Sequence, residues 1–246
     1  EWIQEKKKEG LVKNAGFSFH STPEELEELL TAHPEMDFVQ LQINYADWES
    51  ERVQSRLCYE TARRHGKAVI IMEPVRGGSL AQLQSGLANP FTAYAPNASL
   101  ASWALRFCAS LEGVLMVLSG MSDLAQVEDN IKTFSPLQPL NAEERAVIEA
   151  VREALAKVPS IPCTRCNYCT ETCPAEIPIP DILRALNDGR IYGDAYAARQ
   201  YASACRDKAQ ASACLGCEVC LSRCPQHIQI TEHLHEAVAK FERGED

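Results

Sequence analysis

The 246-residue sequence lacks long apolar runs, an export leader and any excess of positive charge. Its longest apolar stretches, AVIIM and GVLMVL, are far too short to span a bilayer. The net charge of −10 disfavours nucleic acid and anionic membrane surfaces as partners. No charged-then-apolar leader opens the chain, so we expect a cytoplasmic protein. The first residue is Glu1 rather than methionine, on a helix-like stretch, and we therefore expect a fragment of a longer protein.

Several common catalytic motifs are missing as well. The sequence contains no Gly-rich phosphate loop, no HExxH and no GxSxG, and Gly77-Gly78 alone indicates only a turn. A hydrophobic content of 46% and a charged content of 24% are typical of a globular protein with a real core. The unusual component is cysteine, with eleven residues, of which eight fall into two tight runs.

Strand-like and helix-like segments alternate over the first 135 residues. Thr22, Pro23 and Glu25 predict the start of a helix, with Thr22 as its N-cap. Strands are expected at residues 10–18, 37–44, 68–75 and 113–121. Four such βα units predict an α/β fold with a parallel sheet. We therefore assign residues 1–135 to one domain, 136–157 to a bridging helix, and the Cys- and Pro-rich remainder, 158–246, to a second domain.

The cysteine runs are CTRCNYCTETCP (163–174) and CLGCEVCLSRCP (214–225). Each has the spacing C-x2-C-x2-C-x3-C-P, in which three cysteines at two-residue gaps can wrap a loop around one corner of an iron–sulfur cube. Structural zinc favours separated C-x2-C pairs that close one tetrahedron, and two dense runs fit that pattern poorly. The runs therefore predict two [4Fe–4S] clusters, and Cys58, Cys108 and Cys205 are expected to be buried small hydrophobes.

The C-terminal part resembles a two-cluster ferredoxin domain of the mainly helical type. In two-cluster ferredoxins the fourth cysteine of each run binds the other cluster. The resemblance therefore implies one ligand set of Cys163, Cys166, Cys169 and Cys224, and a second of Cys214, Cys217, Cys220 and Cys173. It also implies single-electron transfer with a redox partner protein.

The endings of the four strands carry a second resemblance. They read GFSFHS, QLQINYADW, MEPVRGGSLA and VLSGMSDLAQVEDNI. Together they resemble strands five to eight of the aldo/keto reductase family, whose fold is a (β/α)8 TIM barrel with NADP(H) across its C-terminal rim. The resemblance thus implies an α/β fold formed by the C-terminal half of a barrel, followed by the helical ferredoxin domain, and a small carbonyl substrate.

The same resemblance assigns nucleotide-binding residues. Ser18 and Gln40 match the positions beside the nicotinamide carboxamide; Ser122 and Gln126 match those at the adenosine 2′-phosphate; Asp129 and Asn130 match those at adenine. The alternative for each is a polar residue at a strand or helix end without a ligand. Phe19 replaces the usual asparagine, and Asp123 and Gln126 stand where a basic residue often meets the phosphate, so NADP and NAD both remain open.

No catalytic residue is assigned. The family takes its catalytic Tyr, Lys, Asp and His from strands one to four, which have no counterpart here, so we expect no carbonyl reduction by this chain alone. His20, Tyr45 and Asp47 are read as rim or surface residues. Four parallel strands cannot close a barrel, and their open edges predict an upstream half or, as an alternative, the pairing of two half-barrels.

Two functions follow from these resemblances. The first is the C-terminal part of an iron–sulfur oxidoreductase in which the barrel binds a nicotinamide nucleotide and the clusters carry electrons. Hydride moves electrons in pairs and clusters move them singly, so a flavin, a partner protein or a structural role for the clusters must reconcile the two. The alternative is a non-catalytic electron-transfer module with the half-barrel as a docking scaffold.

Overall fold

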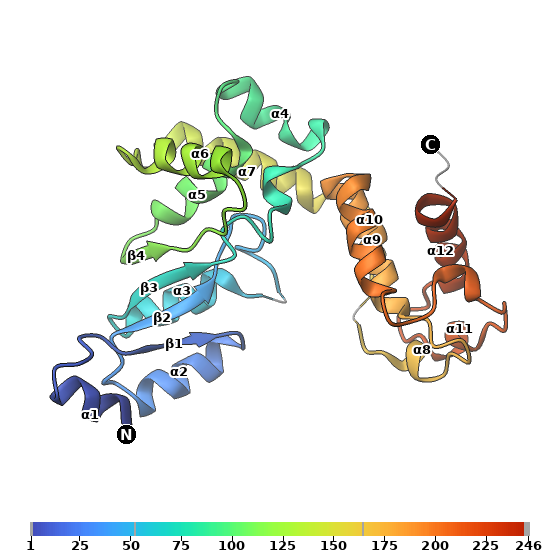
Figure 1. Ribbon diagram of the computed structural model, residues 1–246, viewed down its shortest axis with the longest axis horizontal. Coiled ribbons are helices and arrows are strands. Elements are labelled where there is room, and N and C mark those ends of the chain that lie inside the picture. The colour runs from blue at the N-terminus through green and yellow to red at the C-terminus, as the bar shows by residue number, and fades with distance from the viewer. Residues whose placement is uncertain (1, 52, 164, 244–246) are drawn as a thin grey trace. The chain divides into compact units, whose positions relative to one another are not determined.

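The computed structural model describes residues 2–51, 53–163 and 165–243. The chain forms two compact units (Figure 1): unit 1 holds residues 1–81 and 88–155, and unit 2 holds residues 82–87 and 156–246. Up to residue 156 the elements are α1 (Trp2–Lys8), β1 (Gly16–Phe19), α2 (Pro23–Ala32), β2 (Phe38–Gln42), α3 (Ser55–Arg64), β3 (Ala68–Met72), η1 (Ser79–Ala81), α4 (Ser85–Tyr94), α5 (Leu100–Ala109), β4 (Val114–Val117), α6 (Leu124–Phe134) and α7 (Ala142–Ala156). Beyond it follow α8 (Tyr168–Glu171), α9 (Ile179–Tyr192), α10 (Asp194–Ala204), η2 (Ala211–Ala213), α11 (Val219–Arg223), α12 (Ile230–Ala237) and a π-helical turn, η3 (Val238–Glu242).

Unit 1 is built on a four-stranded parallel sheet. The strands lie side by side in the order β1-β2-β3-β4, which is also their order along the chain (Figure 1). All four predicted strands are present, although each is shorter than expected. Thr22 caps α2 as predicted, since its hydroxyl accepts a hydrogen bond from the Glu25 amide. The predicted α/β class with a parallel sheet is confirmed.

One face of the sheet is covered by helices and the other is not. Val39, Leu41, Val69 and Ile71 alternate along β2 and β3 and are fully buried in the core that α2, α3 and α5 complete. Right-handed crossovers between strands in sequential order place every helix on the same face of the sheet. The residues that alternate with the buried ones point to the opposite face, which no helix among the described residues covers. They are only half-buried on β2 and β3, and Met116 on β4 is 51% exposed.

Helix α7 packs within unit 1. Glu144 forms a two-pronged ion pair with Arg106 on α5, with both N···O distances at 2.8 Å, and Ile148 and Val151 are buried. Asn141 and Glu144 bond reciprocally through side chain and backbone at the start of the helix, as the capping pattern predicts. The segment that the sequence separates as a bridge thus belongs structurally to the first unit, because its buried apolar side chains have their partners there.

Unit 2 is an assembly of short helices around the two cysteine runs. Its core is formed by apolar residues of α9 and α12, together with sulfur atoms from both runs. The stretch PDILRALND (180–188) predicts a helix that ends at the following Gly189, but α9 continues to Tyr192. Gly189 serves close packing instead, because a Cβ atom there would lie 3.2 Å from the Cβ of Ala197 on α10. Gly193, with a φ of 86°, makes the turn between the two helices.

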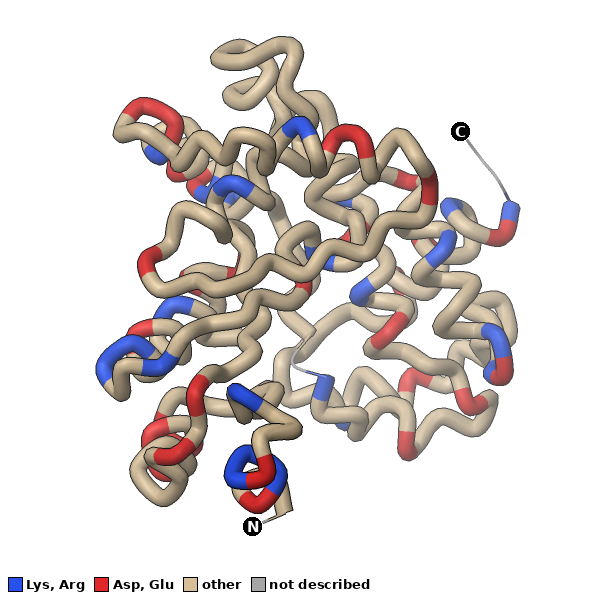
Figure 2. Tube along the Cα trace, turned by 60° about the vertical axis from the view of Figure 1, so that its left-hand side comes forward, with Lys and Arg blue, Asp and Glu red and all other residues tan. Residues whose placement is uncertain are grey.

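Charge is distributed over both units rather than gathered in one segment (Figure 2). Acidic residues exceed basic ones by 34 to 24, which gives the net charge of −10. Within the described part of the chain, no helix has both the length and the apolar character needed to cross a membrane.

Candidate functional site

The eight clustered cysteines surround two separate hollows in unit 2. The first hollow is lined by Cys163, Cys166, Cys169 and Cys224. The second hollow is lined by Cys214, Cys217, Cys220 and Cys173. Each hollow thus receives three cysteines from one run and the fourth from the other. This is the crossed grouping that the ferredoxin resemblance implies. None of these cysteines forms a disulfide.

The two runs have left-handed residues at matching positions. The third residue of each run, Arg165 or Gly216, has a φ of 60° or 63°, and the fifth, Asn167 or Glu218, has a φ of 66° or 58°. Left-handed residues also follow the fourth cysteine at matching positions, at Glu176 and His227. Left-handed residues within such turns direct successive N–H groups inward, an arrangement that recurs around phosphates and iron–sulfur clusters. L-residues other than glycine rarely adopt this conformation, so its repetition indicates a functional constraint.

Burial opposes ionisation of three of the thiols in these hollows, those of Cys163, Cys169 and Cys220. It raises the pKa of Cys220 to about 11, and the neighbouring Cys214 and Cys169 add to the effect. Burial likewise raises the pKa of Cys163, with Cys166 and Cys224 contributing. These three thiols would therefore stay protonated at neutral pH without a positively charged partner. Binding of iron would release these protons and supply that partner.

The geometry of the cysteines does not match a single metal ion. Among residues 2–51, 53–163 and 165–243, no three His, Cys, Asp or Glu side chains are grouped closely enough to hold one. Four cysteines spread around each hollow, on a nest-forming backbone and among apolar residues such as Ile177 and Ile228, are the donor set expected of a cluster. The three other cysteines, Cys58, Cys108 and Cys205, are buried and line neither hollow, as expected for small hydrophobes.

The first pair of predicted nucleotide residues lies on the helix-free face of the sheet. Ser18 on β1 and Gln40 on β2 are direct register partners, so their side chains are neighbours. Ser18 is exposed and Gln40 is half-buried, with its Nε2 3.4 Å from the Sδ of Met72. The C-terminal ends of parallel strands, near which both lie, are where barrel enzymes bind ligands.

The other four predicted residues lie around the start of α6, beyond the opposite edge strand. Gln126 receives a hydrogen bond from the Ser122 amide at 2.8 Å and donates its own amide to Asp123 at 2.9 Å. Asp129 accepts a hydrogen bond from the Ser99 hydroxyl at 2.6 Å, and Asn130 donates one to Ser119 at 3.0 Å. The described residues show no hydrogen bond between this group and the Ser18–Gln40 pair. Their role in binding a nucleotide stays a prediction.

A polar cluster at the ends of β2 and β3 was not predicted. Asn44 is fully buried, and its side-chain amide donates to Asp47 at 2.9 Å and to the carbonyl of Glu73 at 3.2 Å. Arg76 approaches the same carboxylate at 3.5 Å. Asp47 is only 4% exposed, and Tyr45 is completely buried against Phe91, so neither lies on the surface. Both follow the end of β2, which agrees with the alternative expectation of rim residues. The signal was present in the spacing Asn44-x-x-Asp47, which favours a side-chain-to-backbone turn.

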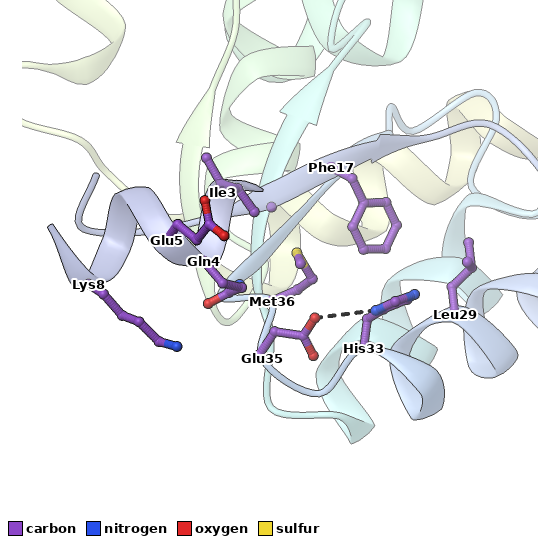
Figure 3. Close-up of a pocket in the computed structure, with 10 residues that line it drawn as sticks. Ile3, Gln4, Glu5, Lys8, Phe17, Leu29, His33, Glu35 and Met36 are labelled. Atoms are coloured by element: carbon purple, nitrogen blue, oxygen red, sulfur yellow. Dashed lines mark hydrogen bonds and ion pairs between the residues drawn. The ribbon is translucent and has the colours of Figure 1, made fainter. Parts of the chain in front are cut away.

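A groove of about 930 Å³ lies at the other end of the strands (Figure 3). It is lined by α1, the start of β1 and the loop after α2, where His33 and Glu35 are 3.2 Å apart. None of the predicted site residues lines it. Active sites of parallel barrels lie at the carboxyl ends of the strands, so this position does not point to catalysis.

Comparison with known proteins identifies both parts of the chain. Residues 1–153 match the model of the aldo/keto reductase family, and residues 162–228 match the model of the 4Fe-4S dicluster domain. A search of curated proteins found no match.

Solved structures with a similar fold include aldo-keto reductase AKR11C1 from Bacillus halodurans in its holo form, with 21% identity over 60% of this chain and a TM-score of 0.46. They also include an aldo-keto reductase from Klebsiella pneumoniae in complex with NADPH, with 19% identity over 61% of this chain and a TM-score of 0.48. This chain covers 53% and 51% of those two chains, about half of each. Since the family model matches more than half of its length, the chain belongs to the aldo/keto reductase family and carries a 4Fe-4S dicluster domain after the reductase domain.

Proposed function

We propose that this chain is part of an iron–sulfur oxidoreductase in which an aldo/keto reductase barrel binds a nicotinamide nucleotide and the dicluster domain carries electrons through two [4Fe–4S] clusters. The observation that carries the proposal is the pair of hollows, each lined by three cysteines of one run and one of the other. Eight free thiols placed in this way need a reducing compartment, which favours the cytoplasm.

The sheet is proposed to be one half of a (β/α)8 barrel. Strands in sequential order place their helices on one face only, and the bare face must then be covered by closure of the sheet on itself. The exposed residues of β4 and the loop after it support this, since Leu115 is 61% and Leu118 is 38% exposed. Ser18 and Gln40 lie on the bare face, which would become the barrel interior below the nucleotide.

The nucleotide would extend along the carboxyl ends of the strands. In this proposal Ser18 and Gln40 hold the nicotinamide carboxamide, and the residues at the start of α6, Ser122, Gln126, Asp129 and Asn130, hold the adenosine end. No residue of this chain is proposed as the proton donor. A small carbonyl compound would be the substrate, and a redox partner protein would exchange electrons with the clusters.

Metal and nucleotide analyses of the anaerobically purified chain test the proposal. Two cubane clusters predict about eight irons and eight acid-labile sulfides per chain. Stoichiometric zinc with little iron would overturn the cluster assignment. Titration with NADH and NADPH, followed by the quenching of protein fluorescence, tests the barrel. Eight irons without any nucleotide binding would support the electron-transfer module in which the half-barrel is a docking scaffold.

A further inference from the structure

The two runs have left-handed residues at the same positions, so residues at equal positions in the two runs can be compared directly. The matching φ angles at Asn167 and Glu218, 66° and 58°, show that these two residues occupy the same place beside their hollows. Any difference in their side chains therefore changes the surroundings of one cluster relative to the other. This comparison rests on the proposed function, since it supposes that both hollows hold clusters.

Glu218 is the one charged residue among the described residues that line either hollow. Its counterpart in the first hollow is the neutral amide of Asn167. Among the other uncharged polar residues, Gln226 lines the first hollow, and Thr172 and Thr231 line the second. The Thr172 hydroxyl already donates to the carbonyl oxygens of Tyr168 and Cys169, so it is not free to bond to a cluster. A carboxylate beside a cluster repels an added electron, and a neutral amide does not. A cluster in the second hollow would therefore be harder to reduce than one in the first.

Two further matched positions act in the same direction. Thr170 follows the third cysteine of the first run, and its buried hydroxyl lies beside Cys169, to whose sulfur it can donate. Leu221 holds the equivalent place in the second run and has no donor to offer. Hydrogen bonds to cluster sulfurs favour the more negative, reduced state.

The third residue of each run supplies the last difference. Arg165 in the first run brings a positive charge, although its pairing with Asp181 at 2.7 Å offsets part of it, while Gly216 brings none. All three matched differences therefore favour an electron in the first hollow.

We propose that the two clusters are unequal electron carriers, and that the cluster held by Cys163, Cys166, Cys169 and Cys224 is reduced first. Glu218 is the main cause of the difference and Thr170 a smaller one. A single electron that enters at the second hollow would pass to the first, which is reduced by one electron as the other is oxidised by one, with no proton required. The second hollow is accordingly the entry side for electrons in the direction that the potentials favour.

Redox titration of the anaerobically purified full chain, monitored by electron paramagnetic resonance, tests this inference. We expect two separate one-electron steps. Glu218→Gln should make the harder step about tenfold easier, a shift of about 59 mV for a one-electron couple. The easier step should stay in place. The reciprocal Asn167→Glu should move the easier step downward, and Thr170→Val should move the same step by less.

Glu171→Gln is the matched control. It removes the same charge from an exposed residue of the first run that lines neither hollow, and it should leave both steps nearly unchanged. One shared potential for both clusters in the wild-type chain would overturn the inference, as would a shift of the easier step in Glu218→Gln. A chain with fewer than eight irons would instead overturn the proposed function, so the two failures can be told apart.

Discussion

The two units are stabilised in different ways. Unit 1 buries aliphatic side chains such as Leu26, Val39 and Ile71 between a sheet and its helices, and this core lies clear of the two cysteine runs. Unit 2 has short helices, and its core includes the sulfur atoms of Cys169 and Cys220 beside the apolar residues of α9 and α12. The local helices at the hollows, α8 and α11, have four and five residues and would not be stable alone.

This difference shows where folding and metal binding are coupled. Each hollow has one buried thiol, Cys169 or Cys220, and burial raises the pKa of that thiol, so it either stays protonated or binds a metal. In unit 1 the buried side chains of Asn44 and Asp47 already have partners within the protein. Unit 2 is therefore expected to depend on iron, and unit 1 is not.

Removal of iron should produce the largest effect. Under anaerobic chelation, we expect backbone amides of α9 and α12 to lose most of their protection from hydrogen exchange, because cluster binding supplies much of the folding free energy of such small domains. Amides of β2 and β3 should keep their protection. Hydrogen exchange with mass spectrometry would measure both in one sample, and reconstitution with iron and sulfide should restore α9. Retained protection of α9 without iron would contradict the comparison.

Double cysteine variants test the crossed ligation within unit 2. If the fourth cysteines cross, Cys166 and Cys173 serve different clusters. Cys166→Ser combined with Cys173→Ser should then remove both clusters and nearly all iron. Cys166→Ser combined with Cys224→Ser should remove one cluster and leave about four irons. Iron and sulfide analysis would decide, and the reverse result would show that each run closes its own cube. Cys205→Ser is the control, since this buried cysteine lines neither hollow, and it should keep both clusters.

The stability of unit 1 should instead depend on its partly buried ion pair between Arg106 and Glu144. Arg106→Ala leaves the Glu144 carboxylate without its partner in a site where the two side chains are only 17% and 12% exposed. Loss of one member of such a pair costs about 3 kcal/mol of unfolding free energy. Chemical denaturation followed by tryptophan fluorescence would measure it. Arg56→Ala, which breaks an exposed pair with Glu49 and Glu60, should cost less than about 1 kcal/mol.

The same pair gives unit 1 a defined dependence on pH. Burial alone would raise the pKa of Glu144, but hydrogen bonds from Arg106 and the Asn141 amide outweigh it and hold the pKa below its usual value of 4.5. The stabilisation is therefore complete above that usual value and is lost as the pH falls through the lower folded pKa. Unfolding curves of Glu144→Gln should show a weaker loss of stability on acidification than the wild-type chain. An equal loss in both would contradict this assignment.

Different parts of the molecule were predictable from the sequence to different degrees. The four strands and the capped helices followed from side-chain period and caps, because these signals are local. The grouping of cysteines from two runs followed from their spacing and the ferredoxin resemblance. The predicted end of a helix at Gly189 was wrong. The sequence alone does not distinguish a glycine that ends a helix from one that allows close packing against a neighbouring helix. Burial of Tyr45 and Asn44 could not be predicted, because it depends on Phe91 and Glu73, which are distant in the chain.

The smallest expected effect concerns the adenosine end of the proposed nucleotide site. Between Arg106 and Lys132 the sequence contains no Lys or Arg, and Asp123 lies at the start of α6. The amides of Ser122 and Gln126, which would face a 2′-phosphate there, already bond to Gln126 and Asp123. We therefore expect the wild-type chain to bind NADH at least as tightly as NADPH.

Gln126→Arg should tighten NADPH binding about tenfold and leave NADH binding nearly unchanged, because guanidinium pairs strongly with phosphate. Gln126→Leu controls for the lost amide, and fluorescence titration would measure all three proteins. A wild-type preference for NADPH would show that the phosphate is held elsewhere.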